Sequence, residues 1–288
     1  MKGWLIVNSF LKTEKFLNIY KMLQNSCSIY NIDLKIITSD YFIGDINDDF
    51  KNVSLPNFVI FWDKDVYLAK RLELCGVKVF NSANAIEICD NKILTALSLT
   101  NKVKTPKTIF APKTFENVNY NNKDFLVKAS KVLGFPFIIK EAFGSFGQQV
   151  YLVENLQQAI LIVDKLKHKD FLMQEFISTS YGKDVRINVV GNKVVSSMLR
   201  INNNDFRSNI SNGGSFYKYE PTPSQINLAL DTCRLLGLDF AGVDVLFGEN
   251  DEPILCEVNS NPNFYSSFEC NGIDLSKEII NYIVGKLK

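Results

Sequence analysis

The segment from residue 239 to residue 259 reads DFAGVDVLFGENDEPILCEVN, and the fold is best approached from it. Two apolar runs, FAGVDVLFG and PILCEV, flank the polar turn ENDE, and this pattern predicts a β-hairpin. Counting back from the turn places Asp244 opposite Glu257. Residues two apart on a strand point to the same face, so Asn259 joins the two carboxylates. The hairpin is therefore expected to carry three oxygen-bearing side chains on one face.

These three side chains need a partner. Oxygen groups that converge on a sheet face are unfavourable if they stay unpaired. Mg²⁺ takes carboxylates, water and phosphate oxygens, so it would stabilise such a cluster. The alternative is a solvated or salt-bridged face. Asp244 has apolar neighbours on both sides, Val243 and Val245, and this favours the metal site.

A lysine and a glycine-containing loop follow another apolar run, FPFIIK. Lys140 closes the run, and Gly144, Ser145 and Gly147 belong to the loop FGSFGQQ. Glycines let backbone N–H groups approach phosphate oxygens, and a lysine adds a positive charge. The spacing G-x-x-x-x-G-K-[ST] of a P-loop is absent from the sequence. The segment fits a phosphate site of another kind, or a lysine whose amino group simply reaches solvent.

Two further polar segments come next along the chain. MQEFI ends an apolar strand with Gln174 and Glu175, and it fits an exposed strand edge or a strand end whose backbone binds a nucleotide base. DFRSN places Arg207 in a loop rich in Asn and Gly, where an arginine has no role in a core. Its guanidinium fits a phosphate or carboxylate ligand, although an ordinary surface loop is the alternative.

The composition excludes several classes of site. The 288 residues carry a net charge of +1, which gives no strong field for nucleic acid or an acidic membrane. The one histidine, His168, lies in the lysine-rich segment KLKHKDF, so histidine-based metal sites and Ser-His-Asp or Cys-His mechanisms are not expected. The six cysteines form no C-x-x-C pair and are expected to be buried thiols.

No segment reads as a membrane helix or a signal peptide. No apolar run reaches the ~18 residues that a membrane helix needs. The apolar stretch near the N-terminus is too short for a signal peptide. We expect a soluble, cytoplasmic protein with neither a nucleic-acid nor a membrane partner.

The first third of the chain alternates predicted strands and helices. WLIVN, DLKIITS, NFVIFWD and VKVFN are the predicted strands, and this βαβ rhythm predicts a parallel sheet. No G-x-G-x-x-G occurs there, so a nicotinamide-binding site is not indicated. Further on we expect Asp90 to cap a helix that starts at Asn91, a hairpin that turns at Gly191, and a final helix from about Asp274.

Taken in order, these segments resemble the ATP-grasp superfamily, and specifically its RimK-like carboxylate–amine ligases. The resemblance is carried by FPFIIKEAFGSFGQQV, MQEFI, GKDVRINVVGNKVV, DFRSNISNGG, AGVDVL and CEVNSNP. DFRSN followed by AGVD and EVN is the most specific part. The match covers about residues 80–285.

The resemblance implies an α/β protein of the α+β ATP-grasp class. An N-terminal, Rossmann-like parallel βαβ domain would span residues 1–95. Two ATP-grasp subdomains with antiparallel sheets would follow and hold ATP between them. The central subdomain would span residues 96–172, and the C-terminal subdomain, with the metal site, residues 173–288.

The resemblance also implies a set of residues that bind ATP. Lys92 and Lys140 would contact the phosphates, the loop from Gly144 to Gly147 would cover them, and Asp184 would hold the ribose. The adenine would lie against Glu175 and its neighbours, largely on backbone groups. The full set expected to bind ATP is Lys92, Lys140, Gly144, Ser145, Gly147, Gln174, Glu175, Phe176, Ile177, Asp184, Arg207, Ser208 and Asn209.

The reaction centre is implied in the same way. Arg207 and Asn209 would act on the phosphates at the reacting end, and Arg186 and Arg200 would lie near the reaction centre or the substrate. The resemblance agrees with the metal site read from the hairpin, and assigns Mg²⁺, with Mn²⁺ as a substitute, to Asp244, Glu257 and Asn259.

Two positions depart from the family pattern. The loop often carries a third glycine where this chain has Gln149. Relatives commonly read Pro-Gly after the metal strand, where this chain has Pro262 followed by Asn263. The second departure lies beside the expected substrate pocket, so it concerns the substrate rather than ATP.

The implied activity is an ATP-dependent ligation. A carboxylate would become an acyl phosphate, an amine would displace the phosphate to form an amide, and ADP and phosphate would leave. The partners would be a carboxylate and an amine, the latter from an amino acid, a peptide or a protein tail. The sequence leaves open whether the protein forms a homo-oligomer. The alternative is an ATP-binding regulatory or phosphotransfer protein of the same fold that forms no amide.

Overall fold

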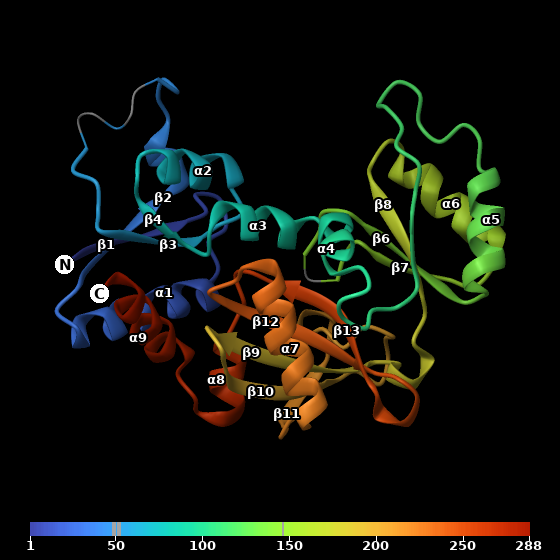
Figure 1. The fold of residues 1–288 in the computed structure, drawn as a ribbon. Helices are drawn as coiled ribbons and strands as arrows, with labels where there is room; N and C mark the ends of the chain where they lie inside the picture. The colour runs from blue at the N-terminus through green and yellow to red at the C-terminus, as the bar shows by residue number, and fades with distance from the viewer. Residues whose placement is uncertain (48–49, 51–52, 146) are drawn as a thin grey trace.

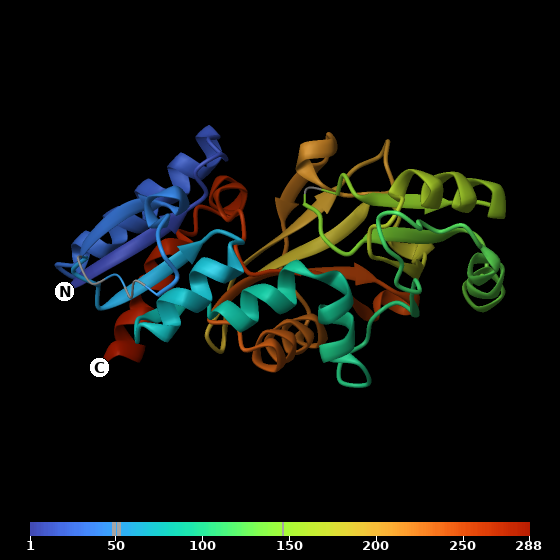
Figure 2. The ribbon, with the colours of Figure 1, turned by 90° about the horizontal axis from the view of Figure 1, so that it is seen from above.

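The computed structural model of the chain describes residues 1–47, 50, 53–145 and 147–288. These residues form three β-sheets covered by helices, arranged in an elongated molecule (Figures 1 and 2). The N-terminal sheet and the central sheet lie at opposite ends, and the C-terminal sheet lies between them (Figure 2). Within the described residues, no helix is long and apolar enough to cross a membrane.

The N-terminal unit is a four-stranded sheet in the order β2-β1-β3-β4, and its paired strands are parallel as predicted. Its elements are β1 (Lys2–Val7), α1 (Glu14–Ile29), β2 (Asp33–Thr38), the 3₁₀ turn η1 (Ser39–Phe42), β3 (Phe58–Trp62), α2 (Val66–Leu74) and β4 (Lys78–Phe80). Helices α1 and α2 pack in separate apolar clusters that receive alternate residues of β1 and β3. Both faces of these strands are therefore covered, which explains their continuous apolar runs.

The central unit is an antiparallel sheet in the order β5-β8-β6-β7. Its elements are β5 (Thr108–Phe110), α5 (Asp124–Leu133), β6 (Phe137–Glu141), β7 (Val150–Val153), α6 (Leu156–Leu166) and β8 (Phe171–Glu175). Phe137 and Ile139 share an apolar cluster with both helices. Because side chains alternate along a strand, Ile138 and Lys140 point to the other face, away from the helices.

The C-terminal unit is an antiparallel sheet in the order β11-β10-β9-β12-β13. Its elements are β9 (Lys183–Val190), β10 (Lys193–Ile201), β11 (Ser215–Lys218), α7 (Pro223–Leu236), β12 (Phe240–Phe247), β13 (Pro253–Asn259), α8 (Tyr265–Asn271) and α9 (Leu275–Leu287). Helix α7, which begins with a capping box at Thr222 and Gln225, covers one face. The hairpin at Gly191 and the final helix are confirmed.

The link between the first and second units differs from one detail of the prediction. Helices α3 (Ala83–Asp90) and α4 (Lys92–Leu99) are separated by Asn91. Asn91, not Asp90, caps α4, because its Oδ1 accepts from the backbone N–H groups of Ile93 and Leu94. Asp90 is the last residue of α3. Strand β8 belongs to the central sheet and runs across the boundary expected between residues 172 and 173.

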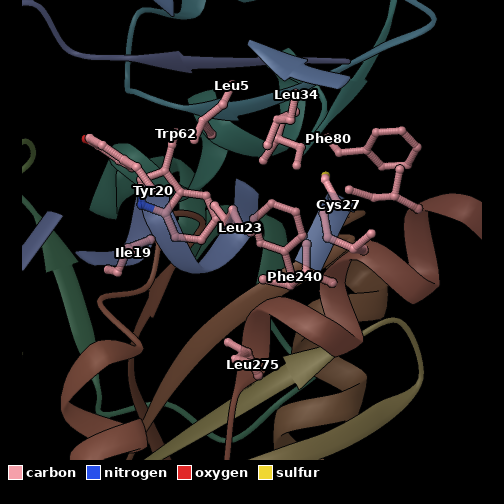
Figure 3. Close-up of a cluster of buried hydrophobic side chains, with 14 of the residues drawn as sticks. Leu5, Ile19, Tyr20, Leu23, Cys27, Leu34, Trp62, Phe80, Phe240 and Leu275 are labelled. Carbon is pink, nitrogen blue, oxygen red and sulfur yellow. The ribbon is translucent and has the colours of Figure 1, made fainter. Parts of the chain in front are cut away.

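The N-terminal and C-terminal units share one apolar core. Helix α9 returns to pack beside α1 (Figure 1), and its Leu275 and Ile279 lie in the same cluster as Leu5. The ring of Trp62 from β3 stacks on Phe240 from β12, with 5.4 Å between the ring centroids (Figure 3). These contacts hold the parallel sheet against the end of the C-terminal sheet.

A buried amide reinforces this junction. Asn81, which follows β4, is fully buried and donates from Nδ2 to the carbonyls of Phe240 (2.9 Å) and Ser260 (2.8 Å). Its Oδ1 accepts from the backbone N–H groups of Asp239 (2.6 Å) and Phe240 (3.2 Å). One side chain thus pairs four backbone groups between two units.

We expect Asn81→Ala to lower the free energy of unfolding by roughly 2–4 kcal/mol, because buried backbone groups would lose their partners. Urea unfolding followed by circular dichroism measures this change. Asn121→Ala, at an exposed position before α5, serves as the control and should change stability by less than about 0.5 kcal/mol. Equal effects of the two substitutions would contradict this role of Asn81.

Candidate active site

A cavity lies between the central sheet and the C-terminal sheet, and most of the residues predicted to bind ATP line it. The predicted residues on its wall are Lys92, Lys140, Gly147, Gln174, Glu175, Phe176, Ile177, Asp184, Arg200, Arg207, Ser208, Asn209, Asp244 and Glu257. Gly144, Ser145, Arg186 and Asn259 do not line it, although Gly144 accepts from Lys92 and Arg186 donates to Asp244, which both do. Segments far apart in the chain are therefore brought to one place.

The hairpin read from the sequence has the expected register. Asp244 on β12 pairs with Glu257 on β13, and Gly242 pairs with Asn259. The pairing then shifts, because Val245 pairs with Leu255 and leaves Cys256 as the extra residue of a β-bulge.

The bulge explains how an apolar strand presents polar side chains. Leu255 and Val258 are three residues apart, yet both lie in the apolar cluster beneath the sheet. Without an extra residue, a spacing of three would place them on opposite faces. With Cys256 inserted, the core takes Leu255 and Val258, while Cys256 and Glu257 line the cavity.

A buried network of charges lies on the cavity face of the C-terminal sheet. Arg186, opposite Asp244 on the neighbouring strand β9, donates to it with Nε and with an NH2 group at 2.8 Å. Arg200 on β10 bridges two carboxylates. It donates to both oxygens of Asp184, and one of its NH2 nitrogens lies 2.9 Å from Asp244 Oδ2. All four side chains are less than one-tenth exposed. Their charges compensate one another within the sheet.

This network sets the charge state of its members. Burial by itself would raise the pKa of Asp244, but the guanidinium groups of Arg186 and Arg200 outweigh it and hold the pKa below 3.8. Burial opposes the charge of Arg200 as well, yet Asp184 and Asp244 raise the pKa of Arg200 above its ordinary value. Asp244 and Arg200 therefore stay charged at neutral pH.

Glu257 and Asn259 offer oxygen atoms that fit a hard cation, whereas both oxygens of Asp244 are already paired with Arg186 and Arg200. Two carboxylates and an amide lie at neighbouring positions on one face. In the part of the chain that the structure describes, no three His, Cys, Asp or Glu side chains gather into a metal cluster. This set would therefore leave coordination positions for water and phosphate oxygens, which is the pattern that Mg²⁺ prefers.

Two lysines lie beside this donor set. Lys92, the first residue of α4, has its Nζ 3.5 Å from Glu257 Oε1 and donates to the carbonyl of Gly144 at 3.2 Å. Lys140 at the end of β6 is 9% exposed, and its Nζ lies 4.0 Å from Cys256 Sγ. Burial raises the pKa of Cys256 to about 11, which leaves a neutral thiol next to the lysine. Both ammonium groups thus face the part of the cavity near the carboxylates.

Three hydrogen bonds fix the loop that carries Gly144, Ser145 and Gly147, which we call the glycine loop. Gln149 Oε1 accepts from the backbone N–H of Ser145 at 3.1 Å, Lys64 Nζ donates to Ser145 Oγ at 3.2 Å, and Arg207 donates to the carbonyl of Gly147 at 2.7 Å. Gln149, a departure from the family pattern, therefore supports the loop conformation. The loop was predicted to run from residue 144 to residue 147, and its Phe146 lies outside the described residues.

Gly147 is required at its position. Its φ is +71°, and a Cβ atom there would lie 2.6 Å from Asn209 Oδ1. The loop thereby approaches the DFRSN segment closely. Arg207 donates to Asp205 from Nε (3.0 Å to Oδ1) and from an NH2 group (2.7 Å to Oδ2). This pairing raises the pKa of Arg207 and lowers the pKa of Asp205. The guanidinium is thus held charged at the loop end of the cavity.

The opposite end of the cavity is largely apolar. Pro106, Ile138 and Leu246 line it together with Phe176 and Ile177. Gln174 is 7% exposed and donates to Thr108 Oγ1 at 2.9 Å, but its Oε1 has no partner among the described residues. The backbone N–H of Glu175 is already bonded to the carbonyl of Lys107. A flat apolar group with a hydrogen-bond donor fits this end.

Several wall residues were missed from the sequence. They are Pro106, Ile138, Val150, Ser180, Lys183, Phe206, Leu246 and Cys256. Strand alternation could have found two of them, because Ile138 lies two residues before Lys140 and Leu246 two after Asp244. The bulge at Cys256 has no signal in the sequence that we can identify.

Comparison with known proteins gives consistent matches. The family model described as a RimK-like ATP-grasp domain matches residues 89–283. An uncharacterised protein of Mycoplasma pneumoniae is 32% identical over 260 residues, covering 88% of this chain and 88% of that protein. A probable alpha-L-glutamate ligase of Maridesulfovibrio salexigens is 34% identical over 75% of this chain and 70% of that protein. A solved RimK domain ATP-grasp protein from Sphaerobacter thermophilus has a TM-score of 0.76 at 18% identity, covering 98% of this chain and 99% of that one.

We expect Asp244→Asn to lower the free energy of unfolding at pH 7 by about 3–5 kcal/mol, because buried guanidinium groups would lose a partner. The Asp244 carboxylate contributes stability above pH 3.8, and this contribution is lost as the pH falls through its lower folded-state pKa. The difference between wild type and variant should therefore shrink in acid. Urea unfolding between pH 7 and pH 3 measures both effects.

Asp231→Asn is the matched control. Asp231 is 53% exposed and pairs with Arg234 within α7, so its loss should change stability by less than about 1 kcal/mol. A stability difference for Asp244→Asn that stays constant from pH 7 to pH 3 would contradict the ionised network.

Proposed function

The chain belongs to the RimK-like ATP-grasp family, and on that premise we propose that it catalyses the ATP-dependent joining of a carboxylate to an amine. The comparisons confirm the resemblance read from the sequence, the predicted fold class and the assignment to the ATP-grasp ligases. The site residues, the reaction steps, the metal and the substrates are proposals.

One observation carries the proposal. Cationic side chains Lys92, Lys140 and Arg207 line the same cavity as the carboxylates of the β12–β13 hairpin. The other end is apolar and contains the unpartnered Gln174 Oε1. A nucleoside triphosphate has the matching shape, because its base is flat and apolar with exocyclic donors and its phosphates are anionic.

We place the phosphates of ATP near Lys92, Lys140 and Arg207, with the glycine loop above them. The adenine would lie against Phe176 and Ile177, where Gln174 Oε1 can accept from the exocyclic amino group. Asp184 would meet the ribose, although in the described structure both of its oxygens accept from Arg200. Ser208 and Asn209 would contact the phosphates from the same loop as Arg207.

The chemistry takes two steps. A carboxylate oxygen of the acid attacks the γ-phosphorus of ATP, the bond to the bridging oxygen breaks, and ADP leaves an acyl phosphate behind. The nitrogen of the neutral amine then attacks the acyl carbon. The carbon–oxygen bond to phosphate breaks, so an amide and inorganic phosphate form, and a proton passes to solvent.

The residues of the site contribute position and charge rather than covalent bonds. Phosphoryl transfer depends mainly on positioning and on neutralising charge at the phosphate oxygens. Arg207 is suited to this task because Asp205 orients its guanidinium next to the glycine loop. Mg²⁺, when bound to Asp244, Glu257 and Asn259, supplies further neutralisation of the phosphate oxygens. Arg186 and Arg200 hold the Asp244 carboxylate in place.

For the substrates we propose an amino acid, or the end of a peptide or protein, on one side of the new amide. A relative named as a probable alpha-L-glutamate ligase makes L-glutamate the first amino acid to test. Asn263 lies beside the expected substrate pocket, so the substrate can differ from that of the relatives. We also propose a cytoplasmic location for the reaction.

The substrates can be found by incubating the enzyme with ATP, Mg²⁺ and a cell extract and searching for new amides by mass spectrometry. With the identified pair, Glu257→Gln should lower kcat by roughly 10²–10³-fold, because a carboxylate that would hold the metal beside the reacting phosphates is lost. Release of ADP should require both the acid and the amine. Coupled ADP detection measures both results.

Glu249→Gln, at an exposed position in the turn between β12 and β13, is the control and should leave kcat unchanged. Absence of ATP binding at millimolar concentration with Mg²⁺ would overturn the proposal. ATP binding without any amide product would favour the regulatory or phosphotransfer alternative.

A further inference from the structure

Asp63 lies at the carboxyl end of the N-terminal parallel sheet, directly after β3. Asn8 follows β1 beside it, because Val7 pairs with Trp62 in the register of the two strands. From β1 the chain crosses to β2 on one side of the sheet, and from β3 it crosses to β4 on the other side. Open α/β sheets bind ligands at such points, where the connections diverge.

The carboxylate of Asp63 is buried without a compensating positive charge. Four carboxylates of the described residues are buried, namely Asp63, Glu141, Asp184 and Asp244. Glu141 pairs with Lys169, and the other two pair with Arg200. Asp63 is 7% exposed and has no ion pair with any described residue. A buried charge in this state is unfavourable unless a ligand compensates it.

The hydrogen bonds of Asp63 are few and neutral. Asn8 Nδ2 donates to its two oxygens at 3.1 and 3.4 Å, and the backbone N–H of Lys64 donates at 2.7 Å. These contacts fix the orientation of the carboxylate without neutralising it. An ionised carboxylate has about four lone-pair positions, so at least one remains for a further donor.

A second unpartnered acceptor lies next to Asp63. Asn261 Nδ2 donates to the backbone carbonyl of Asp63 at 2.8 Å, which holds the amide against this turn. Its Oδ1 is buried and has no partner among the residues that the structure describes. A buried carboxylate without an ion pair and an amide oxygen without a donor therefore belong to two residues that are in contact, from different units of the protein.

This place adjoins the reaction centre. Asn261 is two residues beyond Asn259, the last residue of β13 and a predicted metal ligand. Lys64, directly after Asp63, reaches Ser145 of the glycine loop at 3.2 Å and also pairs with Asp90. Asp63 thus lies where the N-terminal sheet meets both the glycine loop and the end of the metal strand.

We propose that Asp63 and the Asn261 side chain bind the protonated amino group of the amine substrate and so position the amine for ligation. The bound ammonium group releases a proton to solvent before its neutral nitrogen attacks the acyl carbon. An ammonium group carries a positive charge and three donors and no acceptor, which matches a carboxylate without an ion pair and an amide oxygen without a donor. The inference rests on the proposed ligase function and adds the recognition of the amine.

The test compares Asp63→Asn with Asp65→Asn. Asp65 caps α2 by accepting from the backbone N–H of Leu68, and asparagine preserves such a cap, so this control removes a nearby charge without removing the cap. The probe is glycinamide, a small primary ammonium, and acetamide is its uncharged counterpart. Binding to the full chain with ADP and Mg²⁺ is measured by ligand-observed NMR titration, which requires no turnover.

We expect wild type and Asp65→Asn to bind glycinamide in preference to acetamide, and Asp63→Asn to bind glycinamide at least fivefold more weakly. The melting temperature of Asp63→Asn should stay equal to wild type or rise, because a buried unpaired charge is removed. With the amine found by the product search, its KM should rise at least tenfold while the KM for ATP is unchanged.

Equal glycinamide binding by wild type and Asp63→Asn would overturn the inference, and so would wild-type binding that does not distinguish glycinamide from acetamide. A lower melting temperature with unchanged binding would assign Asp63 a purely structural role. Failure of the ligase function would appear separately, as ATP binding without an amide product. The glycinamide titration would still test the inference in that case, because it requires no turnover.

Discussion

Compensation of charge inside the C-terminal sheet is the constraint on which the site depends. Asp244 is 3% exposed, and only the guanidinium groups of Arg186 and Arg200 make an ionised carboxylate stable there. Arg200 in turn needs Asp184. The network therefore links the adjacent strands β10, β9 and β12 through side chains, in addition to the backbone hydrogen bonds between these strands. It fixes the Asp244 carboxylate beside Glu257, at the place where we propose that a metal and a phosphate bind.

The same constraint explains the bulge in β13. The apolar core beneath the sheet takes Leu255 and Val258, while Cys256 and Glu257 line the cavity. A regular strand cannot satisfy both sets, because its side chains alternate strictly. Insertion of Cys256 shifts the alternation and satisfies both. The packing of the core and the geometry of the site are thus determined together by one extra residue.

The sequence predicted the parallel N-terminal sheet, the hairpin register and most of the cavity wall, because these depend on local patterns. The length of the turn placed Asp244 near Glu257, and the bulge at Cys256 then sets the exact pairing. Ile138 could have followed from alternation around Lys140. Strands β5 and β11 were not predicted, since each is short and lies in a polar or proline-containing segment. Helix α8 was also missed, and it has no side-chain cap to mark its start.

Other features depend on contacts between distant segments, so no local pattern could indicate them. The pairing of Arg186 and Arg200 with Asp244 joins residues up to 58 positions apart. The role of Gln149 in holding Ser145 needed the loop conformation. The junction at Asn81 spans 179 positions to Ser260. The unpaired state of Asp63 is visible only once its surroundings are known.

The N-terminal sheet is part of this arrangement rather than a separate module. The stack of Trp62 on Phe240 and the packing of α9 against α1 hold its carboxyl edge beside the end of β13. The central sheet meets the C-terminal sheet across the cavity instead, through Lys92, Arg207 and the glycine loop. The proposed ATP site therefore lies at one junction and the proposed amine site at the other.

A crystal structure of the protein with a non-hydrolysable ATP analogue and Mg²⁺ tests the proposed site most directly. We expect the base against Phe176 and Ile177, the phosphates between Lys140 and Arg207, and a metal on oxygen atoms of the β12–β13 hairpin. A nucleotide bound elsewhere, or bound in this cavity with its phosphates far from Asp244 and Glu257, would contradict the proposed site.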